Sequence, residues 1–364
     1  MYSPRTRRRP PVVLTTPVPY LFIPPIFSIA VSIPLFSRVL PSVVESCQDK
    51  CTDAVTPLSP LGQAACFFSV FFKECLSTES SRAFLLCTFA LVTALLTISH
   101  VDASRLINQH TLVLSRPTWI WAAVNVVTGA VVSPFVLCTS IVQLRHTAGI
   151  SWRGDISSQP LPEDDRHDNT GDESRPLVNS PVRPTAASPN LLSLSQNRYL
   201  TSRHRTYAIP ISVIIGFVVP SIVLLIYPSP FVAISWNLFP FSIYIVDRLV
   251  DWLLSKNQHR QNDDIGSNKA SAIRIYIFPM VLSIFAHIYF LVCWARETNI
   301  QWSPAARLML INFWSIILTY WYWLFIESSL GTVLASILLS CVLGPGAGIS
   351  AGWILKEQIL YFQN

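Results

Sequence analysis

Long apolar runs alternate with short polar stretches along the 364-residue chain. A helix needs about 20 mostly apolar residues to cross the hydrocarbon core of a bilayer. Eight segments come near that length, namely Tyr20–Leu40, Phe84–His100, Trp119–Leu144, Tyr207–Tyr227, Phe231–Leu254, Ile273–Ala295, Ala305–Ile326 and Leu330–Ile354. The shorter segment Leu61–Phe72 is a bent span, a re-entrant piece or an interfacial helix. Because only helices satisfy their own backbone groups in lipid, the pattern predicts an all-α, polytopic transmembrane helical bundle of about eight to nine spans, with seven as the lower limit.

The composition argues against a soluble domain. The chain is 51% hydrophobic and 13% charged, whereas soluble domains have about 25% charged residues. The net charge of +6 comes from basic residues at the ends of apolar runs, so it indicates membrane topology rather than nucleic-acid binding. We therefore expect a lipid bilayer and a lipophilic small-molecule substrate as partners, and no nucleic acid. The sequence identifies no protein partner.

Charge and composition divide the chain into five regions. These are a basic cytosolic N-terminus (1–19), a first membrane half (20–144), a linker (145–205), a second membrane half (206–355) and a tail (356–364). The linker is rich in Pro, Ser, Asp and Arg, so we expect it to be mostly disordered. Basic residues place the N-terminus, the linker and the loop Lys256–Arg274 in the cytosol. Regions on the same side of a membrane are separated by an even number of spans, so this arrangement requires Leu61–Phe72 to be counted as a span and favours nine crossings in total. We expect a multi-pass protein of the endoplasmic reticulum membrane.

Two local features leave alternatives open. The first apolar run contains Pro24, Pro25 and Pro34 and is either a kinked span or a cleaved signal peptide, although it lacks a small-residue cleavage pattern. Cys47 and Cys51 lie in a polar loop on the non-cytosolic side, where a disulfide between them is possible. The cysteines in apolar runs, Cys66 among them, are predicted to be small core side chains.

The strongest candidate for chemistry is a pair of acids within an apolar run. Asp247 and Asp251 are four residues apart, so both carboxyl groups project from one face of a helix. Charged side chains are costly in lipid and usually face a bundle interior. Two nearby carboxyl groups favour retention of one proton, which suits a proton donor at neutral pH. The alternative is structural, with Asp247 pairing with Arg248 or with a neighbouring helix and Asp251 at the cytosolic interface.

Glu327 is the second candidate acid. It closes an aromatic run and lies one helical turn after Trp323, so a ring adjoins its carboxyl group. Aromatic faces stabilise cations, which suits carbocation chemistry. The alternative is an interfacial aromatic belt with Glu327 in a short turn.

Several further polar residues lie within or beside apolar runs. His100 and Asp102 end a span, so they are either headgroup-level charges or part of the site. His287 is a lone intramembrane histidine, for which a core hydrogen bond is favoured over proton transfer. Asn125, Asn237 and Asn312 are predicted to join helices by hydrogen bonds. The glycine-rich segment Gly344–Gly348 lies in an apolar run without a preceding strand and is predicted to be a helix break or close-packing site, not a phosphate loop.

Three landmarks carry a family resemblance. They are Trp119-Ile120-Trp121-Ala122-Ala123-Val124-Asn125 with Pro134, the stretch from Ala208-Ile209-Pro210 through Gly216 to Pro220, and Trp236-Asn237-Leu238-Phe239-Pro240. The chain resembles the fungal integral-membrane terpene cyclases of meroterpenoid biosynthesis, in particular the ascochlorin, ascofuranone and macrophorin cyclase group. The resemblance implies an enzyme of the isomerase or lyase type without metal or organic cofactor. It also implies protonation of an epoxide or alkene on a farnesyl-type chain attached to a polyketide or aromatic core, followed by ring closure through carbocations.

The leading interpretation is therefore a membrane-bound terpene cyclase. Asp247 is the expected acid, Asp251 its tuning partner, and Glu327 a second acid or the terminal base. The residues expected to bind substrate are Trp236, Asn237, Tyr244, Trp321, Trp323, His100 and Asp102. The alternatives are a proton-coupled secondary transporter that uses the same acids and a multi-span acyltransferase that uses His287 and Asn312.

Overall fold

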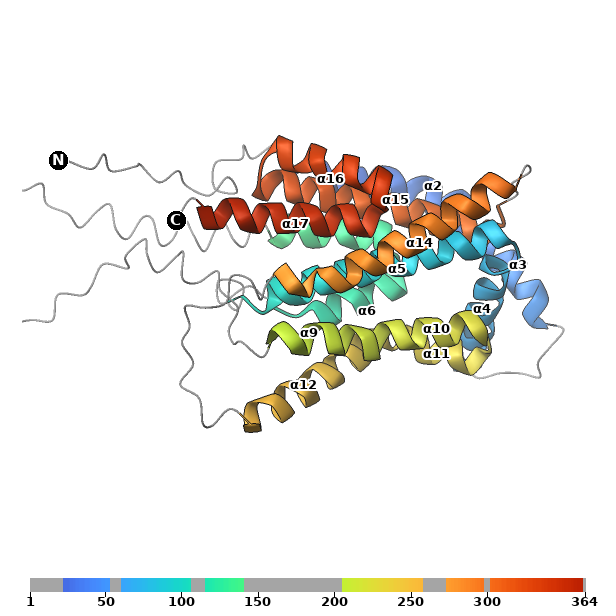
Figure 1. The fold of residues 1–364 in the computed structure, drawn as a ribbon. Coiled ribbons are helices and arrows are strands. Elements are labelled where there is room, and N and C mark those ends of the chain that lie inside the picture. Colours follow the sequence, from blue (N-terminus) through green and yellow to red (C-terminus); the bar gives the residue numbers. More distant parts are fainter. Residues whose placement is uncertain are drawn as a thin grey trace, which may run out of the picture.

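Helices make up nearly all of the described chain. The computed structural model describes residues 22–52, 60–105, 115–140, 205–257, 273–297 and 302–362. No strand occurs within those ranges, so the predicted all-α class is confirmed. The long helices run roughly side by side along one axis (Figure 1). The predicted N-terminal region (1–19) and all but the last residue of the linker lie outside the described residues.

The elements follow one another in chain order. They are α2 (Ile23–Pro34), η2 (Leu35–Val39), α3 (Leu40–Thr52), α4 (Pro60–Cys75), α5 (Glu79–Ala103), α6 (Pro117–Val127), α9 (Arg205–Val213), η4 (Ile214–Val218), α10 (Val219–Ile226), α11 (Pro230–Asn237), α12 (Phe239–Asn257), α14 (Ile277–Arg296), α15 (Pro304–Glu327), α16 (Leu330–Leu343) and α17 (Pro345–Phe362). Both η elements are π-helical turns that join the helices on either side, and a further apolar helix covers Gly129–Ser140.

Fewer helices are long enough to cross a membrane than the apolar pattern predicts. Among the described residues there are five, namely Ile23–Ser46, Glu79–Ala103, Arg205–Ile226, Ile273–Arg296 and Pro304–Glu327. A sixth is obtained if α11 and α12, bent by 59°, count as one span. The chain is therefore a membrane protein with five to six candidate spans, and the predicted eight to nine are not confirmed.

One predicted span, Leu330–Ile354, is a helical hairpin. It breaks at Gly344, whose φ of 96° suits glycine, because a side chain in this region meets the backbone. Pro345 then occupies the first turn of α17, where its missing N–H costs no helical hydrogen bond. The two arms fold back on each other, since the Ser336 hydroxyl donates to the Gly348 carbonyl oxygen at 2.8 Å. The predicted helix break and close-packing site at Gly344–Gly348 is confirmed.

A second predicted span, Trp119–Leu144, is interrupted in the same way. Thr128, between α6 and the Gly129–Ser140 helix, has φ 98° and ψ 144°, close to the φ 96° and ψ 153° of Gly344. The Asn312 side-chain oxygen accepts a hydrogen bond from the Ala130 backbone N–H at 3.0 Å just after this break. Each piece is too short for a full crossing, which explains part of the reduced span count.

The helix α4 lowers the count further. It has 16 residues, is not among the candidate spans, and packs against α3 and α11 at the right-hand end of the bundle in Figure 1. The parity argument for nine crossings counted this segment and is not supported.

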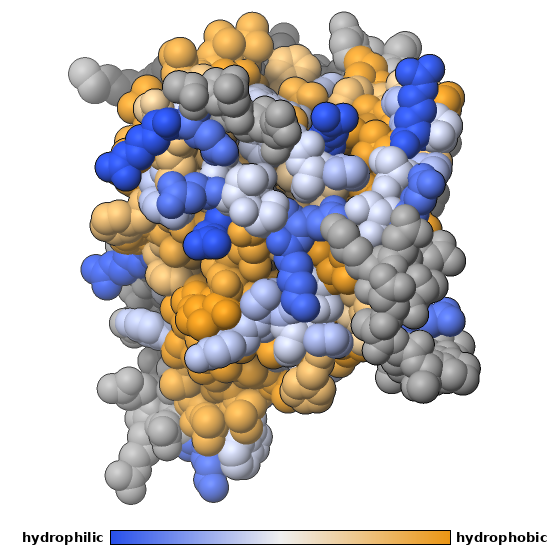
Figure 2. Space-filling view, turned by 90° about the vertical axis from the view of Figure 1, so that its right-hand side faces the viewer, coloured by the Kyte–Doolittle hydropathy of each residue, from blue (hydrophilic) through white to orange (hydrophobic). Residues whose placement is uncertain are grey.

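Hydrophilic side chains gather across this end of the molecule, with hydrophobic ones around them (Figure 2). Cys66 on α4 is buried, as predicted for a small core side chain, and it is also disulfide-bonded, which was not predicted. The side chains of Cys47 and Cys51 lie outside the described residues.

The helix α5 forms the centre of the bundle. Of its most apolar stretch, 78% is buried inside the structure, compared with 17% for the first candidate span. It packs against α9, α14, α15 and α17. Its C-terminal turn carries His100 and Asp102, so two predicted site residues lie at the end of the central helix.

Candidate functional site

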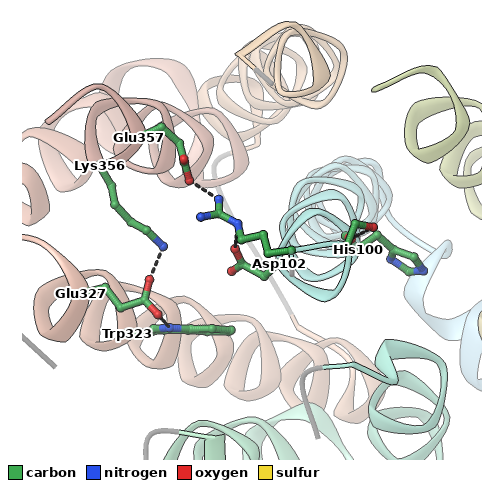
Figure 3. A network of polar contacts seen from close by, with 8 residues as sticks. His100, Asp102, Trp323, Glu327, Lys356 and Glu357 are labelled. Atoms are coloured by element: carbon green, nitrogen blue, oxygen red, sulfur yellow. Dashed lines mark hydrogen bonds and ion pairs between the residues drawn. The ribbon is translucent and has the colours of Figure 1, made fainter. Parts of the chain in front are cut away.

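Ionisable side chains gather in two groups around the end of α5. Figure 3 shows that His100 and Asp102 point to different sides of this helix. The group that we name the Asp247 site consists of Arg205, Asp247, Asp251 and His100. The group that we name the Glu327 network consists of Asp102, Arg105, Glu327, Lys356 and Glu357.

The Asp247 site joins the start of α9 to α12. One guanidinium nitrogen of Arg205 donates to Asp247 Oδ2 at 2.6 Å, and the other donates to Asp251 Oδ2 at 3.4 Å. The four-residue spacing thus turns both carboxyl groups to one partner. Of the two structural alternatives for Asp247, the structure shows pairing with a neighbouring helix and not with the adjacent Arg248.

One oxygen of Asp247 remains open. Asp247 is 7% exposed, and its Oδ1 is buried without a hydrogen-bond partner in the described part of the chain. His100 is equally buried and lies within electrostatic reach of Asp247 and Arg205. Its Nδ1 lies 2.8 Å from the Leu96 carbonyl oxygen and donates to it in the neutral ring, so Nε2 is then the basic nitrogen. Of the two Asp247 oxygens, Oδ1 is therefore the one that remains open to a substrate.

Of the predicted substrate-binding residues on α11 and α12, two are held inside the bundle. Trp236 donates from its ring N–H to the Ser221 hydroxyl at 2.9 Å and packs against the ring of Phe239. The Asn237 side chain donates to a backbone carbonyl oxygen one turn earlier in its own helix, so the prediction that this side chain joins two helices is not confirmed. Its backbone carbonyl accepts from Asn125, which confirms the predicted helix-joining role of that residue.

Tyr244 is placed differently. It is 47% exposed, and the guanidinium carbon of Arg248 lies 5.3 Å from its ring centroid. Both side chains lie on the outward face of α12, away from the buried Asp247. The structure thus does not bring Tyr244 into the Asp247 site.

The Glu327 network ties three helices together (Figure 3). Arg105, just beyond the end of α5, pairs with Asp102 Oδ1 at 3.0 Å and with Glu357 on α17. The preceding residue of α17, Lys356, is ion-paired with Glu327 at the end of α15. The network therefore fixes the ends of α5, α15 and α17 relative to one another.

Both oxygens of Glu327 are engaged. Its Oε1 accepts a hydrogen bond from the Trp323 ring N–H at 2.8 Å, and its Oε2 is ion-paired with Lys356. The predicted contact between Trp323 and Glu327 is thus present. This is the arrangement of an ionised carboxylate rather than of a proton donor.

The cations of the network are deeply buried. Arg105 is 7% exposed and Lys356 is 3% exposed. Burial by itself lowers the pKa of Arg105, but the carboxylates of Glu357 and Asp102 outweigh burial and raise that pKa well above its ordinary value. The guanidinium therefore remains charged and holds α5 to α17.

Aromatic rings line one side of the network. Tyr320, Trp323 and Trp353 have centroids 5.6 to 5.9 Å apart. The Lys356 ammonium lies 4.9 Å from the Trp353 centroid, so a protein cation already occupies the face of that ring. Trp321 is partly buried and packs against the hydrophobic core cluster to which these three rings belong.

Several residues of both groups were missed by sequence reasoning. Arg205 was assigned to the end of the linker, and Lys356 and Glu357 to the tail, because charges at the ends of apolar runs usually mark topology. The helix α17 in fact continues to Phe362. A helix extended through this segment places Trp353, Lys356 and Glu357 on adjoining positions of one face, which was the available signal.

His287 and Asn312 lie beside the two interrupted spans. His287 Nε2 is 3.3 Å from the Cys341 carbonyl oxygen, and its side chain adjoins Gly344. Asn312 holds the Ala130 N–H at the other break. This agrees with the predicted core hydrogen bond of His287 and the helix-joining role of Asn312. His287 lies at the break at Gly344, and Asn312 lies at the break at Thr128. No contact among the described residues joins them into the pair expected of an acyltransferase.

One comparison with known proteins finds a match. A family model described as the CtvD domain matches residues 177–298. This segment contains Arg205, Asp247 and Asp251, whereas every member of the Glu327 network lies outside it. By its name the family is related to fungal meroterpenoid cyclases, which supports a role in fungal secondary metabolism. No curated protein and no solved structure matches the chain significantly.

Proposed function

We propose that the chain is a membrane-bound terpene cyclase that protonates an epoxide or alkene of a prenylated polyketide or aromatic substrate. The observation that carries the proposal is Asp247, a buried acid with one oxygen outside any hydrogen bond among the described residues. The match to the CtvD domain over the same segment supports it.

The proposed proton donor is Oδ1 of Asp247. Oδ2 of the same carboxyl group already accepts from Arg205, whereas Oδ1 is buried where no described group donates a hydrogen bond to it. Oδ1 is therefore the oxygen of this carboxyl group that is left to exchange a proton with a substrate. Asp251 accepts from the same guanidinium, so it helps to hold Arg205 beside Asp247.

The proposed reaction is an isomerisation. The Asp247 carboxyl group donates its proton to the epoxide oxygen, the C–O bond breaks, and a neighbouring alkene forms the new C–C bond. The resulting carbocation loses a proton, and the Asp247 carboxylate takes up a proton again. With an alkene substrate, the first proton adds to carbon instead. In both cases the product has the mass of the substrate.

A bundle interior suits this chemistry. A prenylated substrate partitions into lipid, and the bundle excludes water that would capture a carbocation. The ring of Trp236 packs against that of Phe239. Phe239 lies on α12 eight residues before Asp247, which corresponds to about 12 Å along the helix. Rings at that distance along the helix are suited to the hydrocarbon chain of a bound substrate.

The direct test incubates microsomes that contain the protein with an epoxyfarnesyl-aromatic substrate and with its unepoxidised parent, in H₂O and in D₂O. In H₂O, we expect one of the two substrates to give a cyclised product of unchanged mass, identified by mass spectrometry and NMR. An alkene substrate should acquire one non-exchangeable deuterium in D₂O, whereas an epoxide substrate should acquire deuterium only in its exchangeable hydroxyl group. Microsomes without the protein are the control, and no conversion of either compound would contradict the proposal.

A proton-coupled transporter is the second candidate, because the chain contains interrupted spans. Transporters often build their binding sites from discontinuous helices, and Thr128 and Gly344 each break a predicted span. Uptake of a lipophilic acid into proteoliposomes driven by a pH gradient, without chemical conversion, would favour this function.

A further inference from the structure

The outward face of α12 carries a regular alternation of rings and cations. Tyr244, Arg248, Trp252 and Lys256 follow at intervals of four residues, so they form one stripe along the helix, which we name the α12 stripe. The Arg248 guanidinium lies 5.3 Å from the Tyr244 centroid, and the Lys256 ammonium lies 5.6 Å from the Trp252 centroid. Tyr244 is 47% exposed and Trp252 is 57% exposed.

The cations of the stripe differ from those inside the bundle. Arg105, Arg205 and Lys356 are each paired with a carboxylate. Arg248 and Lys256 form no ion pair with any described residue. The two acids nearest to Arg248 on the helix both accept from Arg205 instead.

The surroundings of the stripe are apolar and unpacked. Ile245, Leu249 and Leu253 beside it are 49 to 63% exposed. The other side of α12 packs against α9, η4 and α6, and Figure 1 shows α12 diverging from α9 toward its C-terminal end. The outward face thus combines surface suited to acyl chains with cations that have no counter-ion among the described residues.

We propose that the α12 stripe binds the phosphate group of an anionic phospholipid. Long cationic side chains extend along apolar surface to reach lipid phosphates at the interface. The Arg248 guanidinium can donate two parallel hydrogen bonds to phosphate oxygens. The rings of Tyr244 and Trp252 hold the cations in place, and the exposed leucines contact the acyl chains.

The test uses the full chain purified in a mild detergent and titrated with phosphatidylglycerol or phosphatidylcholine, followed by native mass spectrometry. We expect wild-type protein to bind phosphatidylglycerol more tightly than phosphatidylcholine. Arg248→Gln combined with Lys256→Gln should weaken phosphatidylglycerol binding on the order of tenfold and leave phosphatidylcholine binding unchanged. The charge-preserving pair Arg248→Lys and Lys256→Arg should retain most of the binding.

The matched control replaces one arginine and one lysine elsewhere. Arg307 and Lys73 are both exposed, and neither lies on α12. Arg307→Gln combined with Lys73→Gln should bind both lipids like the wild type. Equal loss in this control, or unchanged binding after the α12 substitutions, would overturn the proposal. Loss of a dimer species in the α12 variant alone would also overturn it, because the face would then serve a second copy of the chain.

Discussion

The Asp247 site and the Glu327 network both place carboxyl groups against cations at one end of α5, but the hydrogen bonds of these carboxyl groups differ. In the Asp247 site, Arg205 binds one oxygen of Asp247, and the other remains outside any hydrogen bond among the described residues. In the network, Glu327 engages Trp323 with one oxygen and Lys356 with the other. An acid within a membrane bundle is therefore a candidate proton donor only where its partners leave an oxygen open. By this criterion we assign Asp247 to chemistry and Glu327 to stability.

The largest expected effect comes from breaking the network. Lys356→Met leaves the Glu327 carboxylate without its cation, which should destabilise the protein by about 3 kcal/mol or more. Thermal unfolding of purified protein in detergent, followed by tryptophan fluorescence, measures the loss. Lys73→Met, at an exposed position, is the control. Adding Glu327→Leu should restore part of the stability, and a wild-type transition in the single variant would refute the structural role.

Removal of the proposed proton donor should mainly affect activity. Asp247→Asn keeps a hydrogen-bonding group of the same shape but cannot donate an acidic proton, so the cyclisation rate should fall at least about 100-fold. Glu327→Gln, at a carboxyl group whose two oxygens are both engaged, is the matched comparison and should change the rate per folded molecule much less. If the two variants lose activity equally, the distinction between the two groups is wrong.

A smaller loss of stability is expected at the hairpin. Gly344→Ala places a side chain at φ 96° and brings its Cβ to 2.7 Å from the His287 Cβ. The backbone conformation alone should cost about 1–2 kcal/mol, and the contact adds to that cost. Gly331→Ala, where the added Cβ meets no atom closer than 3.8 Å, is the control. Both variants are compared by thermal unfolding, and equal stability would mean that the turn adapts freely.

The smallest effect is expected at Trp323. Trp323→Phe removes one hydrogen bond to Glu327 but keeps a ring, so the stability should fall by about 1.5 kcal/mol. Activity per folded molecule should remain near the wild-type value. A large fall in rate with unchanged stability would instead make Trp323 a substrate-binding residue, as the sequence pattern predicted.

The sequence by itself determined the features that arise within single helices. Apolar periodicity and length predicted the all-α membrane class. Four-residue spacing predicted the common face of Asp247 and Asp251 and the contact between Trp323 and Glu327. Such relations follow from the rise and rotation of one helix and need no knowledge of neighbouring elements.

The tertiary structure alone decided which partners these residues have. Arg205 lies 42 positions before Asp247, and Glu357 lies 252 positions after Arg105. It also decided that Leu330–Ile354 folds back at its glycine and that the tyrosine of α12 faces outward. Contacts between helices depend on how every element packs around α5, and the apolar pattern of one segment does not predict which helices pack against it. The acids were therefore visible in the sequence, but only the fold distinguished the open carboxyl group of Asp247 from the fully engaged one at the end of α15.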